Sequence, residues 1–270
     1  MRLPELAALM QRTEGALIAR YLTADPRLAK RSGVRVSHAG GLISWTMGST
    51  DNGFLNRALG FGTMSDATPT VLDRLERRFA AAYRTPRIAV AQGPTPRAAL
   101  RLLERRGYTP EEGTEEHIYC YDRASLPRAR PVSGLTIERV SSDGAKEYAR
   151  LAFASFRERG PWFRDILETL VRAHGRSLNA YLGRVDGVAA ATGMLFALRP
   201  VAGLGNASVV DKFRGRGIQS AMIDHRMRAG WARRLRIFFA QTDNPVSAHN
   251  LEGLGWRRLY TEVDWVRSAR

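Results

Sequence analysis

Apolar residues recur at helical spacing in three stretches of the first half of the chain. This spacing predicts helices over 3–22, 70–83 and 96–106. Alternating apolar and polar residues over 34–46, around Gly40 and Gly41, predict a hairpin, and short apolar runs predict strands over 87–91 and 117–121. Helices and strands therefore alternate, which is typical of an α/β (α+β) fold.

The second half of the chain repeats this alternation. We expect strands over 135–139, 236–241 and 258–266, and a hairpin over 181–198 that turns at Asp186 and Gly187. Helices are expected over 143–156, from Pro161 to near His174, over 218–227 and over 247–254. The apolar stretch 187–210 has one charged residue, Arg199, but Pro200 and the glycines within it favour buried strands over a membrane span.

The two halves meet at residues 125–134, where Pro127, Pro131 and Gly134 interrupt the periodicity. A chain of 270 residues is also long enough for two domains of ordinary size. We therefore predict one domain over 1–124, a linker over 125–134 and a second domain over 135–270.

A short sequence occurs in both halves, Arg87-Ile-Ala-Val-Ala-Gln92 and Arg236-Ile-Phe-Phe-Ala-Gln241. Each copy is followed by a proline-containing loop, a predicted helix and a further strand. The two copies are 149 residues apart. The shared order of elements indicates duplication of one domain.

The segment Arg214-Gly-Arg-Gly217 lies between a predicted strand and a predicted helix. Gly215 and Gly217 let the backbone turn and approach a ligand closely. Backbone N–H groups at the start of a helix favour an anion, here those of Ile218, Gln219 and Ser220. Arg214 and Arg216 add planar donors suited to phosphate. These features indicate a pyrophosphate site, although neither the P-loop nor the dinucleotide-binding glycine pattern is present.

This turn resembles motif A of the GNAT superfamily of N-acetyltransferases, [Gln/Arg]-x-x-Gly-x-[Gly/Ala], which holds the pyrophosphate of acetyl-CoA. Arg214 fills the first position and Gly217 the fourth, whereas Gln219 departs from the small residue usual at the sixth. A Gln at a helix start can still donate to phosphate. The segment from Asn250 to Trp256 resembles motif B, and Asn250 is expected to order the local loop or to touch the CoA arm.

The resemblance implies two tandem GNAT-like domains, each a mixed central sheet flanked by helices, with acetyl-CoA as the co-substrate. Between Gly60 and Ala67 the first half has no Arg-x-x-Gly-x-Gly. We therefore expect a degenerate first copy that serves as a scaffold or as a wall of the acceptor site. Pairing of the two copies within one chain would replace the dimer contact of single-domain relatives and leave a monomer.

The catalytic groups are less defined than the donor site. The resemblance implies that the central strands splay after Val210, so that Val209 and Val210 are candidate backbone partners of the pantetheine arm. Leu251 occupies the position of the usual tyrosine acid, and Tyr260, His249 and Glu252 are possible substitutes. A proton relay through water, or loss of catalysis, is the alternative. Trp162 and Phe163 are either acceptor-pocket residues, as the resemblance implies, or two core aromatics.

Composition narrows these possibilities. The net charge of +16 comes from 39 arginines and three lysines, which are scattered along the chain. Nucleic-acid binding prefers one basic face interleaved with aromatic residues, so this pattern disfavours it. The single Cys120 excludes an internal disulfide, and the five dispersed histidines give no metal-ligand pattern. We expect no metal, no signal peptide, no membrane association and a cytoplasmic location.

The leading hypothesis is an acyl-CoA-dependent N-acetyltransferase that transfers an acetyl group directly to an amine on a small molecule or a protein. Its first rival is a catalytically inactive acyl-CoA-binding module. Its second rival is an arginine-rich nucleic-acid-binding protein.

Overall fold

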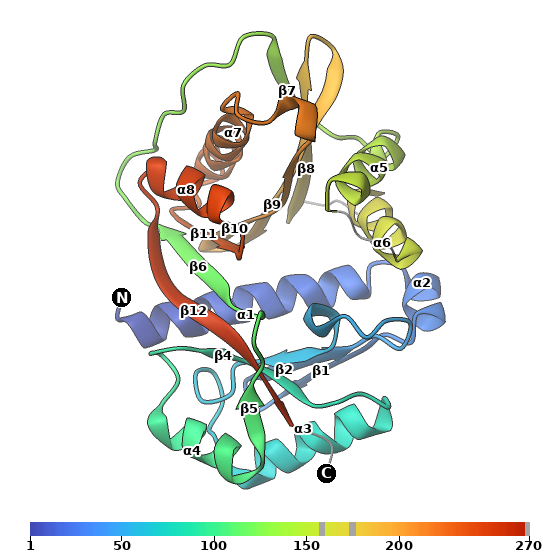
Figure 1. Ribbon diagram of the computed structural model, residues 1–270, viewed down its shortest axis with the longest axis vertical. Coiled ribbons are helices and arrows are strands. Elements are labelled where there is room, and N and C mark those ends of the chain that lie inside the picture. Colours follow the sequence, from blue (N-terminus) through green and yellow to red (C-terminus); the bar gives the residue numbers. More distant parts are fainter. Residues whose placement is uncertain (157–159, 173–176, 268–270) are drawn as a thin grey trace. The chain divides into compact units, whose positions relative to one another are not determined.

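The computed structural model describes residues 1–156, 160–172 and 177–267 (Figure 1). The chain forms two compact units. Unit 1 comprises Met1–His117 with Leu259–Arg270, and unit 2 comprises Ile118–Arg258. Each unit contains a mixed sheet with helices packed on it, as predicted for a tandem α/β protein.

Unit 1 has the strand order β1-β2-β3-β4-β12, and β5 pairs with the end of β12. β3 and β4 are parallel, and the other neighbours are antiparallel. Leu72, Leu75 and Phe79 of α3 pack with α4 residues against Ile88 and Val90 of β4. Its elements are α1 (Leu3–Leu22), α2 (Pro26–Arg31), β1 (Arg35–Ala39), β2 (Leu42–Thr46), β3 (Arg57–Leu59), α3 (Pro69–Ala81), β4 (Arg87–Ala91), α4 (Arg97–Arg105), β5 (Tyr108–Pro110) and β12 (Arg257–Arg267).

Unit 2 has the strand order β6-β11-β10-β9-β8-β7. β10 and β11 are parallel, and β7, β8, β9 and β10 form an antiparallel series. Helices α5 and α6 lie on one face of this sheet, and α7 and α8 lie on the other (Figure 1). Its elements are β6 (Glu116–Tyr121), β7 (Leu135–Arg139), α5 (Ala145–Phe156), α6 (Pro161–Arg172), β8 (Leu178–Val185), β9 (Val188–Leu198), β10 (Val201–Val209), α7 (Ile218–Ala232), β11 (Ile237–Thr242) and α8 (Pro245–Gly253).

The apolar stretch 187–210 forms strands, as its proline and glycines predict. It contributes β9 and β10, which pair with each other. Among the described residues, no helix combines the length and the apolar character that crossing a membrane requires.

The two sequence halves exchange their last strands. β12 comes from the second half but pairs with β4 in unit 1, where Val263 faces Val90 and Trp265 faces Ile88. β6 comes from the first half and lies beside β11 in unit 2. The predicted boundaries 1–124, 125–134 and 135–270 follow the predicted duplication, and the compact units differ from them by these two strands.

Two short elements were not expected from the hydrophobic pattern. α2 is too short to show a period, and it starts because the Asp25 side chain accepts from the N–H groups of Arg27 and Leu28, with Pro26 at its first position. β5 has three residues and depends on its pairing with β12. The predicted end of α6 near His174 lies outside the described residues.

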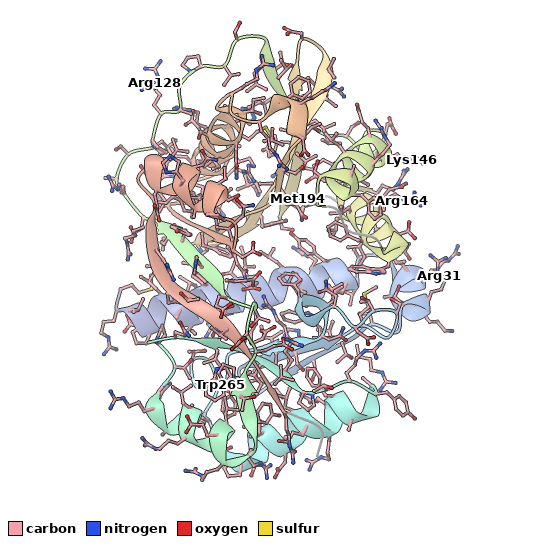
Figure 2. All side chains as sticks on the ribbon, viewed as in Figure 1. Arg31, Arg128, Lys146, Arg164, Met194 and Trp265 are labelled. Carbon is pink, nitrogen blue, oxygen red and sulfur yellow. The ribbon has the colours of Figure 1, made fainter. Side chains whose placement is uncertain are left out.

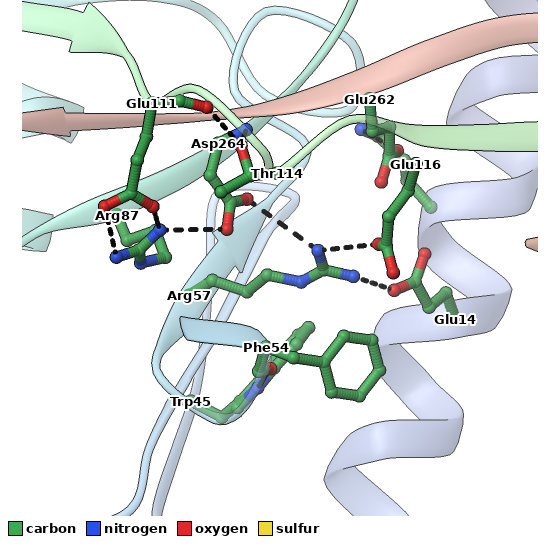
Figure 3. A network of polar contacts seen from close by, with 11 residues as sticks. Glu14, Trp45, Phe54, Arg57, Arg87, Glu111, Thr114, Glu116, Glu262 and Asp264 are labelled. Carbon is green, nitrogen blue, oxygen red and sulfur yellow. Dashed lines mark hydrogen bonds and ion pairs between the residues drawn. The ribbon is translucent and has the colours of Figure 1, made fainter. Parts of the chain in front are cut away.

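A buried ion network connects the elements of unit 1 around Arg57 on β3 (Figure 3). Arg57 is 2% exposed, and its guanidinium lies 2.5 Å from Glu14, 3.1 Å from Glu116 and 3.7 Å from Asp264. Burial alone would lower the pKa of Arg57, but the surrounding carboxylates raise it, so the group stays charged. The network therefore joins α1, β3 and β12 with Glu116, which belongs to unit 1 although β6 continues into unit 2.

Glu262 is a further buried carboxyl group beside this network. Its Oε1 accepts from Gln11 Nε2 at 2.8 Å, and its Oε2 has no hydrogen-bond partner among the described residues. Burial, followed by the charge of Glu14, raises the pKa of Glu262 to about 8. Burial likewise raises the pKa of Glu14. The folded chain therefore keeps a proton on Glu262 that the unfolded chain loses near the usual pKa of 4.5.

This proton predicts a pH dependence of stability. The contribution of this proton to the free energy of unfolding is fully present below pH 4.5. It falls as the pH rises from there, by up to about 1.4 kcal/mol per pH unit, and is lost once the pH has passed about 8. Glu262→Gln should remove most of this slope in urea unfolding measured from pH 5 to 9. Glu112→Gln, at an exposed carboxylate of the same unit, should keep the parental slope. Equal slopes for Glu262→Gln and the parent would show that Glu262 is already ionised in the folded chain.

Candidate acyl-CoA site

The predicted anion-binding turn lies between β10 and α7 in unit 2. Gly215 and Gly217 both have positive φ, 75° and 76°, a conformation that favours glycine. Gly217 is the N-cap of α7 and has no side chain to accept from the helix N–H groups. The N–H groups of Ile218, Gln219 and Ser220 therefore point out of the helix start without an intrahelical acceptor, as an anion site requires.

The two arginines of the turn are exposed. Arg214 pairs with Asp211 at 2.9 Å, and its Nε donates to the carbonyl of Val209 at 3.3 Å. The Arg216 guanidinium lies 5.8 Å from the ring centroid of Phe213. Both cations therefore stay close to the turn and in reach of solvent, where they can meet a phosphate.

Side chains at the start of α7 are tied to α8. Gln219 Nε2 donates to Ser247 Oγ at 2.9 Å, and Gln219 Oε1 accepts from Asn250 Nδ2 at 2.9 Å. Ser220 Oγ donates to Asn250 Oδ1 at 3.4 Å. The Gln219 amide, expected to donate to phosphate, instead connects two helices, and the backbone N–H of Gln219 has no acceptor within the helix. Asn250 orders this region, which is one of its two predicted roles.

The splay of the central strands begins earlier than predicted. β10 pairs with β11 from Val201 opposite Ile237 to Leu204 opposite Ala240, and the pairing stops there although β11 continues to Thr242. The parting therefore starts at Gly205 and not after Val210. A register shift between Gly205 and Ser208 marks a β-bulge in β10, and Asn206 within it has a positive φ of 48°.

The bulge determines which backbone groups face the opening, the region beyond Leu204 where β10 and β11 no longer pair. The N–H of Val210 donates to the carbonyl of Ala190 on β9 at 2.9 Å, so Val210 cannot also serve a ligand. Val209 faces Ala191 in the adjacent, non-hydrogen-bonded position, so its N–H and carbonyl point away from β9. Of the two predicted valines, Val209 offers its N–H to the side where β11 no longer pairs.

The candidate catalytic side chains lie in different surroundings. His249 is exposed on α8, and Glu252 of the same helix accepts from the Tyr119 hydroxyl at 2.8 Å. Tyr260 is buried on β12 in unit 1, so it is not in the unit that carries the anion-binding turn. Leu251, at the position of the family tyrosine, is 4% exposed and belongs to the apolar core of unit 2.

Trp162 and Phe163 begin α6, and both are half-buried. Their rings meet edge to face, with centroids 5.7 Å apart and an interplanar angle of 71°. They lie on the face of the sheet that carries α5 and α6, opposite α7 (Figure 1). Their role in acceptor binding stays a prediction.

Three further residues of unit 2 were not singled out from the sequence. Tyr119 and Ser247 are found only through their partners, because nothing local marks them. Arg226, in contrast, could have been found from the sequence. Ile218, Met222, Arg226 and Gly230 follow each other at four-residue steps on the buried face of α7, so an arginine stands within an apolar stripe.

Unit 1 has a matching strand–turn–helix with different chemistry. Gly60 and Gly62 turn the chain between β3 and α3, but residues 58–73 contain no arginine or lysine. Pro69, the first residue of α3, has no N–H, and Thr68 Oγ1 accepts from the N–H of Val71 at 3.3 Å. The start of α3 is therefore capped by its own chain, whereas the start of α7 is open.

These features define the fold of the GCN5-related N-acetyltransferases. A GCN5-related N-acetyltransferase from Kribbella flavida superposes with a TM-score of 0.67 and 18% identity, covering 93% of this chain and 96% of that one. A second one, from Sphaerobacter thermophilus, gives a TM-score of 0.60 and 13% identity, covering 99% and 94%. The sequence matches no model of a known protein family, and no curated protein matches it.

The tandem arrangement is also found among solved structures. A tandem GNAT protein from the clavulanic acid biosynthesis pathway superposes with a TM-score of 0.58 and 15% identity, covering 85% of this chain and 84% of that one. The chain therefore has the tandem GNAT fold that its sequence predicts. At these identities, the likeness is one of fold.

The turn glycines give a direct test of the anion site. A Cβ at Gly217 would meet only Val132 Cγ2, at 3.6 Å, but a β-branched residue at φ 76° is strained by about 1–3 kcal/mol. Gly217→Val should distort the open helix start and weaken acetyl-CoA binding at least tenfold in calorimetry. Gly187→Val, at φ 80° in the β8–β9 turn with open space around it, carries the same strain as a control. Parental affinity in Gly217→Val would mean that the turn does not hold the pyrophosphate.

Proposed function

We propose that this chain is an acyl-CoA-dependent N-acetyltransferase whose unit 2 binds acetyl-CoA and transfers the acetyl group directly to an amine. Two features that lie next to each other along the chain carry the proposal. The first is the unpaired part of β10, which begins at Gly205 and includes Val209, and the second is the uncapped start of α7. An extended pantetheine arm needs free strand backbone, and the attached pyrophosphate needs free N–H donors.

The chemistry requires few groups from the protein. The neutral amine attacks the thioester carbonyl, the C–S bond breaks, and the amine loses a proton while the CoA thiolate gains one. In this proposal the Val209 N–H, which points away from β9, polarises the carbonyl as negative charge develops on its oxygen. His249 is exposed on α8 and is the side chain that we propose for proton exchange with solvent. Water can carry the second proton.

One observation favours a binding module without catalysis as the second candidate. The family tyrosine is replaced by Leu251, which has no proton to give and is buried in the core. Glu252 beside it accepts from Tyr119, and burial, followed by this hydrogen bond, raises the pKa of Tyr119. A phenol with a raised pKa keeps its proton, so this pair supplies a hydrogen bond and no ready base.

Part of the arginine excess is used inside the fold. Arg57, Arg87, Arg106 and Arg184 each pair with two or more carboxylates. Charged side chains of both signs spread over the surface of each unit (Figure 2). This mixture supports a small-molecule or protein amine as the acceptor more than a nucleic acid.

Turnover separates the two candidates. We expect release of free thiol from acetyl-CoA in the presence of a panel of amines (amino acids, aminoglycosides, polyamines and lysine peptides), and no release with Gly217→Val. Binding of acetyl-CoA without thiol release on any amine would favour the module.

The difference between the two helix starts supports one donor site in each chain. The α7 start has open N–H groups and two arginines, whereas the α3 start is capped by Thr68, lacks an N–H at Pro69 and has no arginine or lysine within residues 58–73. An anion therefore gains much less at α3.

Calorimetric titration of the whole chain with acetyl-CoA measures the number of sites. We expect one acetyl-CoA per chain, and none bound by Gly217→Val at the same concentrations. Two equivalent sites per chain would overturn the assignment of unit 1 as a degenerate copy.

A further inference from the structure

Arg226 on α7 is a buried cation without a carboxylate partner in the described part of the chain. It is 1% exposed, and its hydrogen bonds go to three backbone carbonyls: Met222 at 2.9 Å, Met194 at 3.1 Å and Gly205 at 3.3 Å. Burial lowers the pKa of Arg226 to about 10, so the group is still charged at neutral pH. A buried, unpaired charge is costly, so its presence requires a reason.

Two of these carbonyls, those of Gly205 on β10 and of Met194 opposite it on β9, lie where the bulge begins. Gly205 faces Met194, but Ser208 already faces Thr192, so Asn206 and Ala207 share one opposing residue, Gly193. The extra residue interrupts the ladder and frees backbone groups. Arg226 reaches across from α7 and donates to the carbonyls of Gly205 and of Met194, which Figure 2 labels on β9. The side chain thus adds hydrogen bonds to the last regular pair before the bulge.

The strand surface is shaped to accept this guanidinium. A Cβ on Gly193 would lie 2.9 Å from Arg226 Cζ, so only glycine lets the group approach β9 this closely. The bulge is also held by α5 and β9. The Asn206 carbonyl accepts from Tyr148 Oη at 3.4 Å and from Thr192 Oγ1 at 3.2 Å. The conformation of residues 205–208 is therefore fixed by side chains from several elements.

This bulge coincides with the parting of β10 from β11, because Leu204 is the last paired residue and Gly205 is the first unpaired one. We propose that Arg226 is a positioning residue for acyl-CoA: by holding the bulge, it keeps β10 apart from β11 and preforms the opening that receives the pantetheine arm. The inference rests on the proposed function. It adds that the opening is maintained by a specific cation, which touches neither the pyrophosphate turn nor Val209.

The test compares two ligands that differ only in the part that enters the opening. CoA carries the pantetheine arm, whereas adenosine 3′-phosphate 5′-diphosphate carries the pyrophosphate without it. In the full chain, Arg226→Met should lower the affinity for CoA at least tenfold while leaving that of the nucleotide within twofold. Arg228→Met, which removes an exposed arginine of the same helix, should leave both affinities within twofold. A role in general stability would weaken both ligands equally, and that result would overturn the proposal.

Two further variants keep the test decisive where Arg226→Met does not fold. Arg226→Lys retains a cation that reaches fewer carbonyls, and Tyr148→Phe removes one hydrogen bond from the bulge. Each should show a smaller loss that is again confined to CoA. An unchanged CoA affinity in both variants would overturn the role of the bulge. A parent chain that binds neither ligand would overturn the proposed function, and this inference with it.

Discussion

The pairing of β10 with β11 ends at Leu204, and each part of the proposed donor site depends on that ending. Beyond it, Val209 turns its backbone toward a side without a partner strand, and the chain enters the glycine turn at an open helix start. A continuous ladder would have used the same N–H groups within the sheet. The opening therefore exists because the structure leaves backbone groups unpaired at one place and supports the distortion with side chains.

The sequence predicted the turn well and the strand before it less well. Gly215 and Gly217 could be interpreted because a positive φ and a helix start have local signatures. The choice between Val209 and Val210 could not be made, because one extra residue in the bulge reverses which of them faces β9. The bulge is held by hydrogen bonds from Arg226, Tyr148 and Thr192, which are distant from it in sequence. Local patterns carry no information about such contacts.

The exchange of last strands has a similar origin. The repeated sequence predicted two similar halves, and the hydrophobic pattern located both β6 and β12, but a strand pattern does not name its neighbour. Ion pairs contribute to the placement of β12 beside β4. Asp264 on β12 lies 3.2 Å from Arg87 and 3.7 Å from Arg57, and Glu262 accepts from Gln11, so β12 brings carboxylates to the arginines of unit 1. Its pairing with β4 thus adds carboxylates to arginines that already pair with Glu14, Glu116 and Glu111 of the first half.

Arg57 and Arg226, the two buried arginines among the described residues, are accommodated in different ways. Arg57 is surrounded by more carboxylates than it can neutralise, and the excess is relieved by a proton on Glu262, whose pKa is near 8. Arg226 is surrounded by carbonyls, which do not titrate, and its own pKa of about 10 leaves it charged at neutral pH. A rise in pH through 8 therefore acts on the core of unit 1, while the bulge in unit 2 keeps its hydrogen bonds. In the proposed donor site, the groups that hold the opening are carbonyls and a charged arginine, so the titration of Glu262 in unit 1 does not involve them.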